Sequence, residues 1–355
     1  MNPWRESLQQ SRCPADSRTV RHHSHSRVVV QTPLDLYAIA LLLNYERAST
    51  EPRFRHAKLI DIATTSDSES SSRVGPVREI VRSQQWVSRT GPKDGFVFEK
   101  LSSAPRDEPD LPANMLPSPI PDGLKSLTPK NLETIFWQAR GHDGCYKSVT
   151  LLQHFFDLYP PDMPLRVRTS AGADYLTSAS TRVILELKLL KPKLMTIAHV
   201  VGSRTYITGA ADTMMHAVAG FAESQDGNVA TILDLASLQF GDAGRGVGGR
   251  STFALESLDA FYDRVETIAV WADTDNARTS ARIGPCSDDA WLKQVARRAK
   301  ARWDTRDTHA WCGHCGGPGA ELKKCSLCRE EAYCNGAHQA AAWPYHKRFC
   351  AGRKK

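Results

Sequence analysis

The last part of the chain restricts the fold more than any other, because its cysteines and histidines come in pairs. Between residues 312 and 350 the sequence contains C-x2-C, C-x2-C, C-x3-H and H-x3-C, in that order. Two residues three or four apart can face one metal ion, since a tight turn or one helical turn brings their side chains together. Four such pairs predict two closed four-ligand sites of the kind that structural Zn²⁺ occupies. The predicted ligands are Cys312, Cys315, Cys325, Cys328, Cys334, His338, His346 and Cys350.

A disulfide framework is the alternative for a segment so rich in cysteine. Six of the nine cysteines of the chain lie here, and so short a segment buries too little surface to fold without a crosslink or a metal. Disulfides would use the six thiols but leave His338 and His346 without a role. The first 30 residues also lack the apolar stretch of a secretory signal, which favours a reducing compartment. We therefore expect two structural zinc ions and an intracellular protein, in the nucleus or the cytoplasm.

The positions of the histidines bear on which pairs share an ion. Asn335 is suited to cap a short helix, and Pro344 is expected to interrupt it and to begin a second helix. His346 and Cys350 then lie on one face of the second helix. His338 lies eight residues before His346, roughly 12 Å along a continuous helix, which is too far for one ion. This favours pairs that alternate between the two ions.

The segment resembles the MYND-type zinc finger in its ligand order and in the residues around the ligands. Its spacing is C-x2-C-x9-C-x2-C-x5-C-x3-H-x7-H-x3-C, and Tyr333-Cys334, His338-Gln339, Trp343 and His346-Lys347 fit the same family. The likeness covers residues 312–350 and no more.

The resemblance implies a cross-braced finger with two interleaved sites. One zinc ion would be held by Cys312, Cys315, Cys334 and His338, and the other by Cys325, Cys328, His346 and Cys350. His338 stands where the family usually has cysteine, and imidazole is an equally good zinc ligand. His314, inside the first C-x2-C turn, is expected to be an exposed spectator.

The resemblance also implies a docking module for another protein. Its partner would be a proline-containing peptide lying against the surface around Gln339 and Trp343, although Trp343 also suits the core of the finger. Closed zinc sites leave no position for a substrate, so the finger is not expected to be catalytic. A net charge of +7 is too mild to indicate nucleic-acid binding. No apolar run reaches the roughly 18 residues of a membrane span, so we expect no membrane partner.

The rest of the chain predicts an α+β body with an antiparallel sheet, because helices come first and a run of strands follows. Helices are expected near 129–140, 145–158, 256–265 and 288–302. Strands are expected near 165–168, 194–201, 204–208, 216–222, 229–235 and 267–272, and 182–190 fits a helix or a strand. The expected organisation is a disordered tail (1–30), a helical segment (31–63), a low-complexity and proline-rich linker region (64–126), an α+β domain of unknown function (127–305) and the finger (312–350).

Three residues of the body raise an alternative function, a cysteine-dependent hydrolase or acyltransferase. Cys145 begins a predicted helix, His216 begins a strand, and Asp234 lies in the next strand. This order resembles the transglutaminase-like branch of the papain-type fold. The resemblance implies a nucleophilic thiol, a histidine base and an aspartate that orients it. A three-residue loop over 225–227 would make His216 and Asp234 diagonal neighbours on one sheet face.

Two features speak against an active site of this kind. The interval of 71 residues between Cys145 and His216 is long for that family, and Val218 stands where an aromatic residue is usual. A buried core thiol is the simpler interpretation of Cys145. We therefore assign no catalytic residue from the sequence, leave enzymatic activity undecided and prefer a non-enzymatic role.

Overall fold

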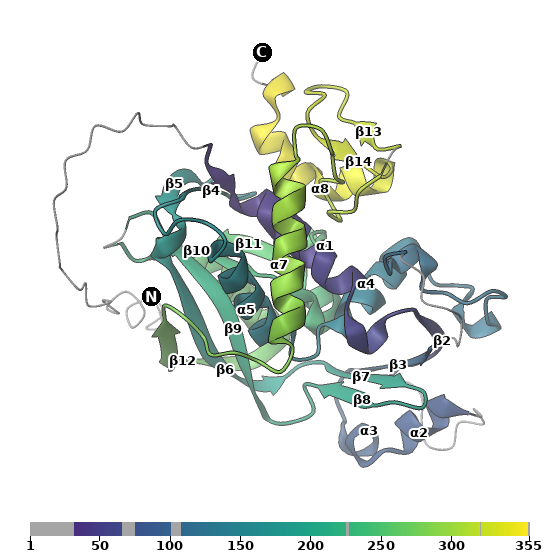
Figure 1. Cartoon of the computed structure of the whole chain (residues 1–355). Coiled ribbons are helices and arrows are strands. Elements are labelled where there is room, and N and C mark those ends of the chain that lie inside the picture. The colour runs from purple at the N-terminus through teal and green to yellow at the C-terminus, as the bar shows by residue number, and fades with distance from the viewer. Residues whose placement is uncertain (1–31, 66–74, 101–107, 225–226, 320, 354–355) are drawn as a thin grey trace, which may run out of the picture.

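The computed structural model describes residues 32–65, 75–100, 108–224, 227–319 and 321–353. The predicted tail over 1–30 lies outside these residues. Figure 1 shows the finger, residues 312–350, in yellow against one end of the long helix α7. The other segments form the body, which contains two larger sheets and the helices that cover them.

The main sheet of the body has five antiparallel strands in the order β11-β10-β9-β6-β12. This confirms the predicted α+β class and its antiparallel sheet. The strands are β6 (Arg182–Pro192), β9 (Thr213–Ala222), β10 (Val229–Asp234), β11 (Ala254–Ser257) and β12 (Ala269–Ser280). The ambiguous segment over 182–190 is therefore a strand, and it pairs on both sides, with β9 and β12.

Side chains alternate across this sheet, so each face has its own helices. Val218 and Ile232 pack with α6 (Leu258–Ile268) on one face, whereas Ala219 and Leu233 belong to the core on the other face. The helices on that second face are α1 (Leu36–Ser49), α5 (Gly144–Phe156) and α7 (Asp289–Asp304). The Asp35 side chain caps α1 by accepting a hydrogen bond from the backbone N–H of Ala38 at 3.0 Å.

A second sheet corrects the prediction of a linker region over 64–126. Its strands, in the order β2-β3-β7-β8, are β2 (Ala57–Ala63), β3 (Lys93–Lys100), β7 (Met195–Val200) and β8 (Thr205–Thr208). Strand β3 lies inside the sheet, antiparallel to β2 and parallel to β7, and its Phe96, Val97 and Phe98 are buried. The helices α2 (Pro76–Arg82) and α3 (Gln84–Ser88) precede it. Strand β2 likewise lies in the segment predicted as helical over 31–63.

The remaining elements are short, apart from the helix α4 (Pro129–Arg140). Thr128 and Asn131 form the capping box of α4, and Gly141 follows its last residue, so the bounds agree with the helix expected near 129–140. The small strands are β1 (Leu34–Asp35), β4 (Pro164–Arg168) and β5 (Asp174–Ser178) in the body and β13 (Lys323–Lys324) and β14 (Ala332–Tyr333) in the finger. The 3-10 helices are η3 (Pro52–Phe54), η4 (Pro112–Asn114), η5 (Asp122–Leu124), η6 (Ala179–Thr181), η7 (Ser237–Gly244), η8 (Val247–Gly249) and η9 (Ala351–Arg353). Across the described ranges, no helix has both the length and the apolar character that crossing a bilayer requires.

The finger is packed on the body. The rings of Tyr37 in α1 and Tyr345 in the finger are stacked, with their centroids 3.5 Å apart. The Arg302 guanidinium in α7 donates to the Gly316 carbonyl at 2.6 Å. A Cβ atom at Gly316 would lie 2.4 Å from the Leu41 carbonyl oxygen, so only glycine allows this approach to α1. The finger therefore has a fixed position beside α1 and α7.

Candidate metal centre and buried thiol site

Both histidine ligands of the finger, His338 and His346, lie on one helix, α8 (Gly336–Phe349), and Cys350 follows directly after it. The Asn335 side chain caps it by accepting from the His338 N–H at 2.9 Å, as predicted. The predicted interruption at Pro344 is wrong, because α8 continues through it. A proline cannot donate to the carbonyl four residues earlier, and Arg250 of the body donates to that carbonyl, of Ala340, at 3.3 Å.

The first cluster joins the first and third pairs of the predicted ligands. Its members are Cys312, Cys315, Cys334 and His338, and their ligand atoms all lie within 4.8 Å of one another. The Cys312 Sγ is 3.3 Å from His338 Nδ1, and the sulfur atoms of Cys315 and Cys334 are 3.8 Å apart. Cys312 is buried, whereas Cys334 is exposed.

The second cluster joins the second and fourth pairs. Its members are Cys325, Cys328, His346 and Cys350, again with all ligand atoms within 4.8 Å of one another. The Cys328 Sγ is 3.6 Å from His346 Nε2. His338 and His346, both on α8, face different clusters, so the pairs alternate between the two sites as the resemblance implies.

The donor atoms of both clusters fit a structural zinc ion. Zinc binds thiolate sulfur at about 2.3 Å in a tetrahedral arrangement, which places two sulfur ligands about 3.8 Å apart. The Cys315–Cys334 separation of 3.8 Å equals that spacing and is far longer than a disulfide bond of about 2.05 Å. The cysteines that the structure describes are all unbridged. Each cluster offers three sulfur atoms and one imidazole nitrogen, a closed set without a place for a substrate.

A residue of the body supports the first cluster through His314. The structure corrects the expectation for His314, whose side chain is only 4% exposed and lies 2.7 Å from a Glu133 carboxylate oxygen. Its ring meets the His338 ring edge to face, with the centroids 4.8 Å apart. Burial alone would raise the pKa of Glu133, but hydrogen bonds and charges from His314 and Arg245 lower it below the ordinary value. Glu133 thus remains a carboxylate that orients the rings beside the metal ligands.

The predicted pair of His216 and Asp234 comes together in the body. The imidazole Nε2 of His216 lies 3.0 Å from the Asp234 carboxylate, and both side chains are buried. The register Leu233↔Ala219 is the one expected for a three-residue loop, but the strands reach it through a bulge between Val229 and Thr231. Arg264 on α6 donates to Asp234 at 3.1 Å and to the Glu256 carboxylate at 2.8 Å. Asp234 is therefore paired on two sides in a site that is buried from solvent.

Charges in this network shift two pKa values in opposite directions. Burial by itself raises the pKa of Asp234, but the charges and hydrogen bonds of His216 and Arg264 lower it to about 2. Burial by itself lowers the pKa of His216, but Asp234 and the neighbouring Cys145 raise it to about 9. Two carboxylates, Asp234 and Glu256, face one guanidinium, so a proton on His216 balances the buried charge.

Cys145 lies close to this network, and its thiol is one of the groups that raise the pKa of His216. It begins α5, which covers the opposite face of the sheet, and its thiol lies 3.9 Å from the Met215 carbonyl oxygen. It also lines a hollow of about 440 Å³ together with Gln239. The amide of Gln239 is 3.2 Å from His216 Nδ1.

Sequence reasoning missed Glu133, Arg264 and Gln239 at these sites. Glu133 reaches His314 across 181 residues of sequence, and Arg264 reaches Asp234 across 30. Neither pair follows a spacing rule of a helix or a strand. The one feature of the sequence that could have indicated a role for His314 was its place inside a C-x2-C turn.

Comparison with known families and proteins gives one match. The profile of the MYND finger family matches residues 312–350. No curated protein and no solved structure matches the chain, and the resemblance of the body to transglutaminase-like proteins finds no support there. The family match and the two clusters identify the C-terminal segment as a MYND finger that fits two structural zinc ions.

Proposed function

We propose that this protein docks a partner protein through its MYND finger, and that the partner presents a proline-containing peptide. The observation that supports it most is the pair of interleaved Cys₃His clusters within a matched MYND finger, because fingers of this family mediate protein–protein interactions. The eight clustered side chains are the proposed zinc ligands. Their role is to hold the shape of the docking surface.

The peptide surface is proposed around Gln339 and Trp343 on α8. Both side chains are half-buried, so part of the Trp343 ring packs in the finger and part of it is accessible to a ligand. The Arg353 guanidinium lies 5.8 Å from the centre of the Trp343 ring. A flat aromatic ring with an exposed part suits the ring of a proline, which needs contact area and few hydrogen bonds. The ring of Tyr345 stacks on Tyr37 of the body, so it is not part of this surface.

Replacing Trp343 by alanine tests the docking surface within the full chain. We expect binding of a synthetic Pro-x-Leu-x-Pro peptide, measured by calorimetry, to weaken about 30-fold, the effect of losing an aromatic anchor. The matched control is Leu327→Ala, since Leu327 is a large exposed apolar residue of the same finger. Equal affinities of Trp343→Ala and the unaltered protein, both with two zinc ions bound, would contradict the proposed surface.

A second candidate function is favoured by the buried His216–Asp234 pair beside Cys145. We propose that Cys145 is a nucleophile for hydrolysis or acyl transfer, with His216 as its proton acceptor and Asp234 holding the ring. The start of a helix favours an anion, and an imidazolium beside it does so as well. Thiolate attack on a carbonyl carbon would form a thioester, and His216 would give its proton to the leaving group.

Alkylation of Cys145 separates this candidate from a plain core thiol. We expect iodoacetamide at neutral pH to label Cys145 at least about tenfold faster than Cys286. Peptide mass spectrometry measures the two labelling rates. His216→Gln should remove the difference, since the thiol then lacks its proton acceptor. A Cys145 that reacts only when the protein unfolds rules the candidate out and leaves the docking function untouched.

A further inference from the structure

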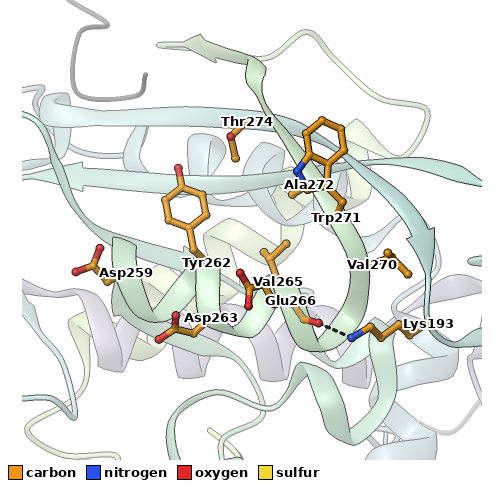
Figure 2. A pocket seen from close by; sticks show the side chains of 10 residues that line it. All are labelled: Lys193, Asp259, Tyr262, Asp263, Val265, Glu266, Val270, Trp271, Ala272 and Thr274. Atoms are coloured by element: carbon orange, nitrogen blue, oxygen red, sulfur yellow. Dashed lines mark hydrogen bonds between the residues drawn. The ribbon is translucent and has the colours of Figure 1, made fainter. Parts of the chain in front are cut away.

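A hollow between α6 and the start of β12 differs from both sites described above. It has a volume of about 320 Å³, and its ten lining residues include no cysteine and no histidine. Figure 2 shows α6 forming one wall with its acidic side chains, and β12 forming the other with Trp271 and Thr274.

Carboxylates dominate the charge of this hollow. Asp259, Asp263 and Glu266 lie on successive turns of α6, and all three are exposed. The one cation among the lining residues is Lys193, whose ammonium group donates to the Glu266 backbone carbonyl at 2.6 Å. Three carboxylates against one ammonium make the hollow attractive to a cation.

Two hydroxyl groups in its walls have no hydrogen-bond partner within the described part of the chain. They are the Oγ1 of Thr274, a residue only 5% exposed, and the phenol oxygen of Tyr262. Figure 2 shows the hydroxyl end of Tyr262 directed toward the side of the hollow where Thr274 lies. A buried hydroxyl without a hydrogen-bond partner lowers the stability of the fold. A ligand with N–H donors could donate to both of these hydroxyl oxygens.

The hollow borders an open strand edge. Strand β12 ends the five-stranded sheet, and among the described strands it pairs with β6 alone. Val270 and Trp271, at the start of this edge, are 63% and 37% exposed. An exposed edge with apolar side chains is a site where an extended peptide can add as a further strand.

We propose that this hollow binds an arginine side chain on an extended segment of a partner protein, and that the segment pairs with the open edge of β12. A guanidinium carries five N–H donors in a plane, which suits the carboxylates of α6 and the two hydroxyls together. The same plane stacks on the rings of Tyr262 and Trp271. A lysine offers one point charge and no flat face, so it meets fewer of these groups.

The test uses the full zinc-loaded chain and a fluorescein-labelled peptide with one arginine between valine and threonine residues. Replacing that arginine by citrulline, its neutral isostere, should weaken binding about tenfold in fluorescence anisotropy, and lysine should weaken it less. Thr274→Val should weaken the arginine peptide about threefold without lowering the melting temperature, because it removes only an unpaired hydroxyl.

A matched pair of charge changes separates local recognition from net charge. Asp263→Asn should weaken the arginine peptide about fivefold, whereas Asp275→Asn, an exposed carboxylate of β12 outside the hollow, should leave the affinity unchanged. Equal effects of these two changes would overturn the proposal. So would equal binding of the arginine and citrulline peptides, or no binding of either at millimolar concentration.

Discussion

Cys328→Ser lowers the zinc content from two ions per chain to one and unfolds the half of the finger that the second cluster holds. Serine does not replace a thiolate as a zinc ligand, and the other three members of that cluster then form an incomplete site. A structural zinc ion contributes on the order of 10 kcal/mol to a small finger, which has little apolar core of its own. We expect metal analysis to give one zinc per chain and the melting temperature of the whole protein to fall.

The loss of stability extends to the body because the finger is packed on it. Tyr345 of α8 stacks on Tyr37, and the second cluster fixes α8 through His346 and Cys350. The matched control is Cys286→Ser, a half-buried cysteine in neither cluster, which should keep both ions. Two zinc ions retained in Cys328→Ser would show that Cys328 is not a ligand.

Asp234→Ala destabilises the body by about 3–5 kcal/mol, the cost of leaving a buried charge without its partner. Arg264 and His216 both pair with this carboxylate, at 3.1 and 3.0 Å, in a site closed to water. Chemical denaturation of the two proteins measures the difference. The control is Asp162→Ala, at an exposed site. Its free energy of unfolding should stay within about 0.5 kcal/mol of that of the unaltered protein.

The same pair makes stability depend on pH, with opposite signs for its two members. The pKa of Asp234 is lowered to about 2, so its contribution is complete above the ordinary value of about 3.9 and is lost as the pH falls through 2. The pKa of His216 is raised to about 9, so its contribution is complete below about 6.5 and is lost as the pH rises through 9. Stability should therefore be highest between about pH 4 and 6.5, and Asp234→Ala should flatten both slopes. Unchanged slopes in the variant would contradict the pairing.

The sequence predicted features that short-range rules determine. The helix expected near 129–140 agrees with the bounds of α4, ligand spacing predicted two four-ligand sites, and the resemblance to the MYND finger gave their interleaved members. The expected placement of His216 beside Asp234 is present as well, although a bulge between Val229 and Thr231 contributes to the register that produces it.

Other features depended on residues far apart and could not be read from a window of sequence. Strand β3 is followed by a serine- and proline-rich stretch, so the sequence placed it in a linker region, and only its pairing with β2 and β7 identifies it as a strand inside a sheet. Pro344 stays inside α8 because Arg250, 90 residues away, satisfies the carbonyl that it frees. The docking of the finger on α1 likewise rests on contacts such as Tyr37 with Tyr345, which no periodicity indicates.

The most direct test of the interleaved metal centre is ¹¹³Cd NMR of the protein after exchange of zinc for cadmium. The mean number of sulfur and nitrogen donors per ion does not distinguish the two arrangements. If the pairs were used in sequence, the first two pairs would hold one ion and the last two pairs the other, and this mean would be the same. Interleaving places three thiolates and one imidazole at each ion, so both cadmium signals should fall in the range of S₃N sites. One signal in the S₄ range and one in the S₂N₂ range, or fewer than two bound ions, would contradict the account.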